Sequence, residues 1–313
     1  MSAVRAAVSV DELQRAWAAV QEGQFRRQHP AAPAPLPDTR AWSSSVPANS
    51  VLANSAPASS VPASWVPTGQ VVVVAGASGR VGASTVALAI ATALQMPARV
   101  VECCSPHASG LAGAASAELG VDVHGWRHGT RGQVVIERTA TAVEHPNQIP
   151  VPSPTSTALT VIDISWSLGQ LATDRAWVWD ALDTVPLVLV TVATVPGMRA
   201  LDVAMHLAGR HAPVVCAVVG PRRKKWPRQA VAAMSPTVAA TDAAGRLVTV
   251  DEHHQLAVVG LTPEPLPPDL VTAGRSLLDL AVQGNAGGLE DDDPKDSAAE
   301  RHSEAEYQRR EAS

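Results

Sequence analysis

The sequence contains very little lysine. Only three of its 24 basic residues are lysines, and none precedes Lys224. Any site in the first 223 residues that depends on a lysine ammonium group is therefore excluded. Arginine supplies almost all of the positive charge, and its planar, permanently charged guanidinium does not replace a lysine in every geometry.

Aromatic residues and paired cysteines are also scarce. The chain has one Phe, one Tyr and eight Trp, yet 46% of its residues are hydrophobic. Such a core must be mainly aliphatic, as in parallel strands covered by helices. The three cysteines, Cys103, Cys104 and Cys216, form neither a CxxC pair nor an even set, so we expect them to be reduced and buried.

Long apolar runs and a strong charge of one sign are missing as well. There is no uninterrupted apolar stretch of about 18 residues, and the segment 10–26 is charged and amphipathic, unlike a signal peptide, so we expect a cytoplasmic protein. The net charge is −5, and residues 290–313 hold nine acidic and four basic residues. Subtracting these from 29 and 24 leaves 20 of each sign. The neutral body favours neither nucleic acid nor membrane, and the acidic C-terminal segment predicts no membrane anchor.

Composition divides the chain into four parts. We expect a short amphipathic helix in residues 1–27, a Pro/Ala/Ser-rich disordered linker in 28–68, one folded domain in 69–283, and an acidic disordered tail in 284–313. The N-terminal helix would begin at a capping box and present an apolar stripe formed by Leu13, Trp17 and Val20. An isolated helix of this length is marginal in water, so it docks either on a protein partner or on its own body.

Strands and helices alternate through the folded domain. We expect strands at 71–75, 99–103, 134–138, 159–164, 187–192, 214–219 and 248–250, helices at 83–94, 196–210 and 225–234, and a Pro-rich loop at 144–156. Alternation of this kind predicts an α/β fold with a doubly wound, mostly parallel sheet.

A glycine-rich loop joins the first of these strands to the first helix. Residues 78–85 read SGRVGAST and resemble the deviant Walker A loop of ParA/MinD-type P-loop ATPases, usually KGGVGKTT. Ser78 and Ala83 stand where that family has its two lysines, and Arg80 replaces the second glycine. The resemblance implies an ATP or ADP site with Mg²⁺, or a degenerate site with no ligand, formed by Gly79, Arg80, Val81, Gly82, Ala83, Ser84 and Thr85.

A second segment strengthens the resemblance. Residues 160–169, TVIDISWSLG, look like the family's Walker B and switch II run, IIDTPPSLG. The resemblance implies a catalytic position for Asp163 and Mg²⁺ held by Ser84 and Asp163; from the residues alone, Asp163 could equally cap the next helix. Glu102 stands at the first Asp of the family's DxDPQ run, which implies a second catalytic position. Looser matches extend over 188–201 and 260–267, so that the resemblance covers about 210 of the 313 residues.

Five positive charges gather in residues 222–228, here called the basic loop. They belong to Arg222, Arg223, Lys224, Lys225 and Arg228, beside Trp226. Such a loop could neutralise the phosphates of DNA without sequence preference. A solvated loop, or an acidic protein partner such as the chain's own tail, is the alternative.

Three functions follow from the resemblance. The first is a ParA/MinD-like homodimer with a degenerate nucleotide site, acting as a scaffold or positioning factor in plasmid or chromosome partition or in conjugal DNA transfer. The second is a weak ATPase in which arginine replaces lysine. The third is a localisation scaffold for a pilus or secretion system, similar to the TadZ/CpaE group. The Ala- and Arg-rich composition suggests a high-GC actinobacterial source, where proteins of this family are frequent on plasmids and conjugative elements.

Overall fold

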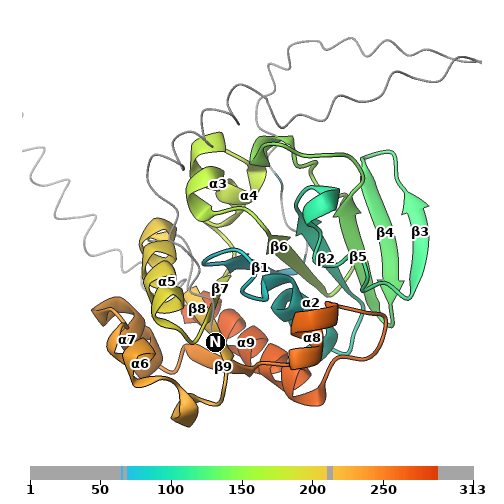
Figure 1. Cartoon of the computed structure of the whole chain (residues 1–313). Helices are drawn as coiled ribbons and strands as arrows, with labels where there is room; N and C mark the ends of the chain where they lie inside the picture. The colour runs from blue at the N-terminus through green and yellow to red at the C-terminus, as the bar shows by residue number, and fades with distance from the viewer. Residues whose placement is uncertain (1–64, 66–68, 210–213, 288–313) are drawn as a thin grey trace, which may run out of the picture. The chain divides into compact units, whose positions relative to one another are not determined.

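The computed structural model describes Trp65, residues 69–209 and 214–283, and the backbone of 284–287. Within that range nine strands form one sheet in the order β3-β4-β5-β2-β6-β1-β7-β8-β9 (Figure 1). Their bounds are β1 Gln70–Gly76, β2 Ala98–Cys103, β3 Ala117–Val121, β4 Trp126–Arg131, β5 Val134–Thr139, β6 Leu159–Ile164, β7 Leu187–Val192, β8 Val214–Gly220 and β9 Leu247–Asp251.

Six of the helices lie in the connections between these strands, and α8 and α9 follow β9. The helices are α2 Ala83–Ala93, α3 Leu168–Asp174, α4 Trp177–Ala181, α5 Val195–Ala208, α6 Arg228–Ala232, α7 Pro236–Ala243, α8 His254–Val259 and α9 Pro268–Gly287. Three short 3₁₀ turns occur at Pro106–Ala108, Pro146–Gln148 and Arg223–Lys225.

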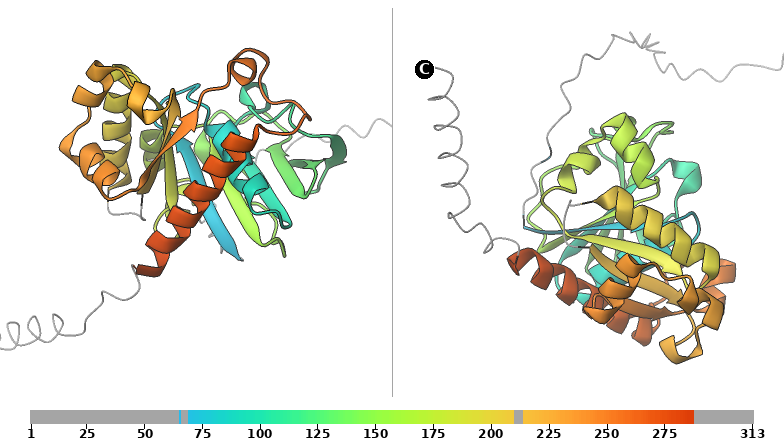
Figure 2. Two further views of the ribbon diagram at one scale, coloured as in Figure 1. Left: turned by 90° about the horizontal axis from the view of Figure 1, so that it is seen from below. Right: turned by 90° about the vertical axis from the view of Figure 1, so that its left-hand side faces the viewer.

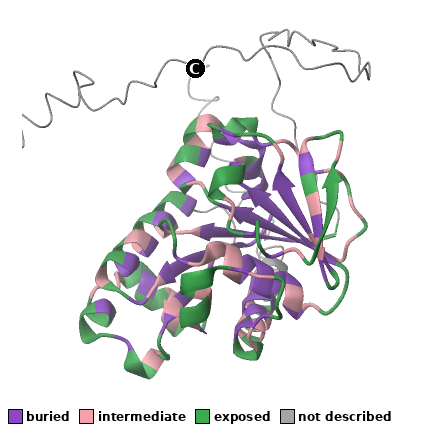
Figure 3. Cartoon of the chain, turned by 45° about the vertical axis from the view of Figure 1, so that its right-hand side comes forward, coloured by how far each residue is buried: buried purple, intermediate pink, exposed green. Residues whose placement is uncertain are grey.

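The central strands are buried because each is an almost continuous aliphatic run. From β5 across to β9 every neighbouring pair is parallel, and at the other edge β4 pairs antiparallel with both β3 and β5. One core layer contains side chains of α2 and α9, and the other contains side chains of α3, α4 and α5. Figures 2 and 3 show the helices on both sides of the buried strands. The predicted α/β, doubly wound, mostly parallel sheet is confirmed.

The connection between β2 and β5 differs from the expected pattern. In place of a helix, this crossover contains an antiparallel hairpin, β3–β4, that extends the sheet (Figure 1). The expected helix at 225–234 is also wrong in extent, because the 3₁₀ turn ends at Lys225 and α6 begins only at Arg228. Pro227 lies between them and has no N–H to continue a helical ladder.

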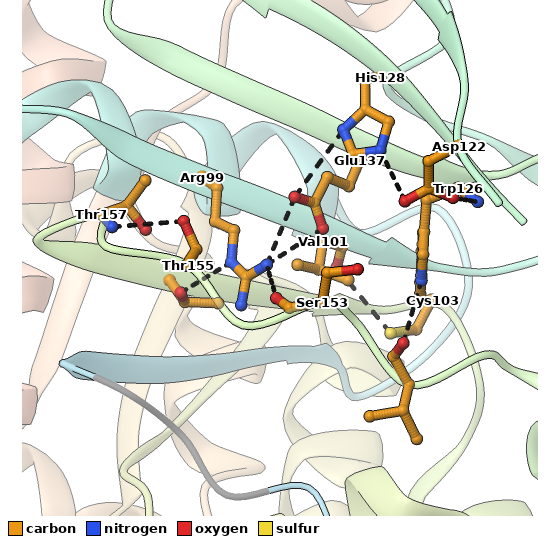
Figure 4. Close-up of polar contacts among 12 residues, drawn as sticks. Arg99, Val101, Cys103, Asp122, Trp126, His128, Glu137, Ser153, Thr155 and Thr157 are labelled. Atoms are coloured by element: carbon orange, nitrogen blue, oxygen red, sulfur yellow. Dashed lines mark hydrogen bonds and ion pairs between the residues drawn. The ribbon is translucent and has the colours of Figure 1, made fainter. Parts of the chain in front are cut away.

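A buried polar cluster supports the hairpin side of the sheet (Figure 4). The Arg99 guanidinium donates to the Thr160 hydroxyl at 3.0 Å, to the Ser153 carbonyl at 2.8 Å and to the Glu137 carboxylate at 3.3 Å. The His128 ring lies 3.9 Å from Glu137 and 3.1 Å from Asp122. Burial raises the pKa of Glu137, and the Arg99 charge opposes that shift. Because the Pro-rich loop supplies the Ser153 carbonyl, this cluster also fixes that loop.

Trp65 contacts the body of the domain. Its ring meets the Trp177 ring of α4 edge-on, with centroids 5.2 Å apart and planes inclined at 61°. Trp177 in turn donates its indole N–H to the Ile149 carbonyl at 3.1 Å. This position within the expected linker therefore packs against α4.

The other terminal predictions fall mostly beyond the described residues. The helix with Leu13, Trp17 and Val20 lies outside them, as does the acidic segment from Glu290. Helix α9 ends at Gly287, which is four residues beyond the expected end of the folded domain at 283. No helix in the described part of the chain is both long and apolar enough to cross a membrane.

Candidate functional site

The glycine-rich loop connects β1 directly to α2. Arg80 and Gly82 adopt left-handed backbone conformations, with φ of 61° and 90°, and Gly82 is the N-cap of α2. The first helical bond runs from the Val86 amide to the Gly82 carbonyl at 3.0 Å. The free amides of the first helical turn and the positive end of the helix dipole therefore face the loop, which is the geometry that binds phosphate.

This loop forms one wall of a cavity of about 1010 Å³. The cavity opens at the carboxyl edge of the sheet, where ligands bind in open α/β folds. The other walls come from the ends of β2, β6, β7, β8 and β9 and from helix α8 with the turn after it. They are formed by residues 107–110, 164–167, 192–194, 219–221, 250–253, 256–257 and 260–261.

Positive charge is scarce in this cavity. Among the described lining residues Arg80 alone carries a permanent positive charge, and it is exposed. Ala83 places a methyl group at the start of α2, while Asp251 and Glu252 add negative charge at the rim. The backbone is therefore shaped for an anion that the side chains do little to neutralise.

Asp163 lies behind the loop as a buried, unpaired carboxylate. It is 0% exposed, and neither carboxylate oxygen has a hydrogen bond of good geometry in the described structure. Burial and the charge of Glu102, its partner in the β2–β6 register, raise the pKa of Asp163 to about 8, and the nearby Ser84 hydroxyl opposes this shift. The fold therefore favours the protonated form of Asp163.

Glu102 is also fully buried, but its carboxylate is well satisfied. It accepts hydrogen bonds from the Ser109 hydroxyl at 2.5 Å, the Gly110 amide at 2.7 Å and the Leu111 amide at 3.0 Å. Burial raises the pKa of Glu102, and these three donors together with Arg138 oppose that shift. The side chain thus holds the segment 105–111 in place, and it has little capacity left to act on a ligand.

The segment held by Glu102 lies against Ser84. A Cβ atom added to Gly110 would lie 2.6 Å from the Ser84 hydroxyl oxygen and 3.7 Å from a Glu102 oxygen. Only glycine, which has no Cβ atom, fits this close to Ser84. The backbone of Gly110 therefore packs against the Ser84 side chain, whose hydroxyl the resemblance assigns to Mg²⁺.

These residues fit a nucleotide in part. The loop backbone and the cavity suit a phosphate chain, and the unpaired oxygens of Asp163 suit a cation or a proton. The close approach of Gly110 to the Ser84 hydroxyl leaves little room there for a hydrated Mg²⁺, which keeps near-octahedral oxygen ligands and several waters. The site therefore suits a phosphate group better than it suits Mg²⁺.

The basic loop begins where β8 reaches the rim of the cavity, but its charges are not all free. The Arg223 guanidinium pairs with Asp242 at 2.5 Å and stacks on the Trp226 ring at 4.1 Å, and the indole N–H donates to the Pro221 carbonyl at 2.9 Å. Arg222 is 3.8 Å from Asp251. Within the described structure Lys224, Lys225 and Arg228 are exposed and have no ion pair.

The fold brings most of the predicted site residues together. The loop 79–85, Asp163 and Glu102 share one edge of the sheet, and the basic loop starts at the same edge. Sequence reasoning missed Ser109 and Gly110, whose Ser-Gly pair carries no recognisable signal, and it missed helix α8 as a wall of the cavity.

No protein-family model and no curated protein matches the sequence. Among solved structures, a putative plasmid partition protein from Borrelia burgdorferi B31, bound to AMPPNP, is similar at 14% identity and a TM-score of 0.44, over 69% of this chain and 99% of the other. The cell division ATPase MinD of Pyrococcus furiosus gives the same identity, TM-score and coverage. A chain of the Aquifex aeolicus MinC:MinD complex is similar at 14% identity and a TM-score of 0.43, over 67% of this chain and 96% of the other. Similarity this distant leaves function to be argued from this chain's own residues.

Proposed function

We propose that the chain is a ParA/MinD-type P-loop protein with a degenerate nucleotide site, acting as a homodimeric scaffold or positioning factor in DNA partition or conjugal transfer. One observation carries the proposal. The glycine-rich loop has a backbone suited to phosphate at the cavity, while Ala83 offers only a methyl group at the start of α2 and the Asp163 carboxyl oxygens have no hydrogen-bond partner among the described residues. Phosphoryl transfer depends mainly on positioning and charge stabilisation, which this site supplies poorly.

Calorimetric titration with ADP and ATP tests this proposal directly. We expect nucleotide to bind through the loop amides, and we expect Gly79→Pro to abolish binding because it removes an amide and restricts the loop. Gly79→Ala keeps the amide and adds a methyl group that meets nothing within 4 Å, so it is the matched control. Failure of the wild-type protein to bind either nucleotide would contradict the proposal and favour a scaffold with no ligand.

ATP turnover should be absent or barely detectable. Without a lysine at the γ-phosphate, and with Glu102 occupied by its three donors, the transition-state charge is not stabilised, and each lost factor of ten in rate is about 1.4 kcal/mol. Asp163→Ala should leave the background rate of phosphate release unchanged. Turnover that disappears in both Asp163→Ala and Arg80→Ala would instead support the weak ATPase.

The basic loop supports a second activity, binding of duplex DNA without sequence preference. Because Arg223 and Trp226 fix the loop, the exposed charges of Lys224, Lys225 and Arg228 are held together without further ordering. A fixed cluster of cations loses less conformational entropy on binding than a mobile one. We therefore assign the loop to phosphate-backbone contact.

Salt dependence tests this assignment. Affinity for a duplex of arbitrary sequence should fall with salt by a log–log slope of about −0.9 per phosphate neutralised. The double variant Lys224→Ala/Lys225→Ala should reduce the magnitude of that slope by about 1.8. Arg127→Ala/Arg199→Ala removes the same charge from exposed positions elsewhere and should change the slope little. Equal effects of the two variants would place the DNA surface outside the basic loop.

A further inference from the structure

The segment 105–111 is built into the side of the cavity next to Ser84. Four of its residues, 107–110, line the cavity, and Pro106–Ala108 form a 3₁₀ turn within it. The Ser105 hydroxyl accepts the Val143 amide at 3.0 Å, which ties the beginning of the segment to the domain. The segment is therefore an ordered wall.

The other end of the wall is fixed by one carboxylate. Glu102 receives the Ser109 hydroxyl and the amides of Gly110 and Leu111 from three consecutive residues. Hydrogen bonds to a charged acceptor are about twice as strong as neutral ones. Loss of this carboxylate would free all three donors together, so Glu102 is a latch for the segment.

The latched segment takes the space that a metal ion would need. Mg²⁺ binds oxygen ligands at about 2.0–2.1 Å and retains several waters around them. Gly110 approaches the Ser84 hydroxyl so closely that even a methyl group would clash there. A hydrated ion on this hydroxyl requires the segment to move away.

We propose that the Glu102 latch makes the cavity select nucleotide without a divalent metal, and that Mg²⁺ enters only when the segment 105–111 is released. This inference rests on the proposed nucleotide-binding function. Glu102 acts here as a positioning residue, because it sets the place of Ser109 and Gly110 without contacting the ligand.

ADP affinity measured by calorimetry in EDTA and in Mg²⁺ tests the latch. For the wild-type protein the two affinities should agree within about twofold. Glu102→Gln and Ser109→Ala should bind ADP about tenfold more tightly in Mg²⁺ than in EDTA, since the released segment leaves room for a hydrated ion beside the Ser84 hydroxyl. Ser116→Ala removes a hydroxyl that donates to Thr130 in the hairpin, away from the cavity, and should behave as wild type.

Hydrogen exchange of the Gly110 and Leu111 amides gives a readout that needs no nucleotide. Both amides should be protected in the wild-type protein and should exchange at least about tenfold faster in Glu102→Gln. Wild-type ADP binding that Mg²⁺ strengthens tenfold would overturn the inference, and so would faster exchange without any gain of Mg²⁺ dependence. ADP bound by no variant in either buffer would overturn the nucleotide function together with the inference, so the two failures are distinguishable.

Discussion

Asp163→Asn will make the protein more stable than the wild type above pH 7, and the difference will grow with pH. The pKa of Asp163 is raised to about 8 in the folded protein, because burial and the Glu102 charge disfavour its ionised form. Between pH 4 and pH 8 the folded state thus retains a proton that the unfolded state has lost. Where the folded state binds more protons, stability falls as pH rises.

Asparagine has the same shape and stays neutral, so Asp163→Asn should remove this loss of stability at high pH. Each unit of pKa shift corresponds to about 1.4 kcal/mol, and we expect a gain of a few kcal/mol at pH 9. Urea unfolding at pH 5, 7 and 9 measures it. Asp279→Asn, at an exposed position of α9, is the control and should change the profile little. Parallel pH profiles for the wild type and Asp163→Asn would show that Asp163 is ionised in the folded protein.

Ala83→Lys will raise nucleotide affinity by about tenfold or more and will raise turnover much less. The ammonium group would enter a cavity whose only permanent cation among the described lining residues is the exposed Arg80, and it would meet a phosphate chain cradled by the loop amides. It would also lie near the carboxylate of Asp163, whose pKa should fall toward its ordinary value beside an opposite charge. Turnover would stay low because Glu102 remains occupied by its three donors and Gly110 remains packed against Ser84.

Ala83→Met is the matched control, because it adds a side chain of similar length without the charge. Titration with ADP in EDTA compares the two variants in the absence of metal effects. If Lys and Met at this position give the same affinity, the loop is no longer shaped to present phosphate to a cation.

The parts of the fold that the sequence predicted are those with a strong local pattern. The aliphatic runs of β1, β6 and β7 are buried on both faces, so each could be recognised without knowledge of its neighbours. The β3–β4 hairpin could not be recognised from its own sequence. All five residues of β3 are exposed and include Glu118 and Gly120, so the strand lacks the alternation of apolar and polar residues that would reveal it.

The candidate site likewise has parts that the sequence predicted and parts that it did not. The strand, loop and helix at 70–93 form one continuous segment, and the end of β6 fixes Asp163 beside it. The donors to Glu102 could not be anticipated, because they depend on how the chain returns after β2. The ion pair of Arg223 could not be anticipated either. The charge pattern placed Arg223 with the other cations of the basic loop, but its partner Asp242 lies 19 residues away in α7.

The contact between Trp65 and Trp177 has a mechanical consequence. Trp65 precedes β1, and β1 lies between β6 and β7 inside the sheet. A tension applied from the N-terminal side of the chain would therefore reach the two indole rings before it reached the hydrogen bonds of β1. Aromatic pairs contribute about 0.5–1.5 kcal/mol beyond their buried area. The two rings would therefore separate first under tension. The sheet that carries the glycine-rich loop would stay unstrained until they had separated.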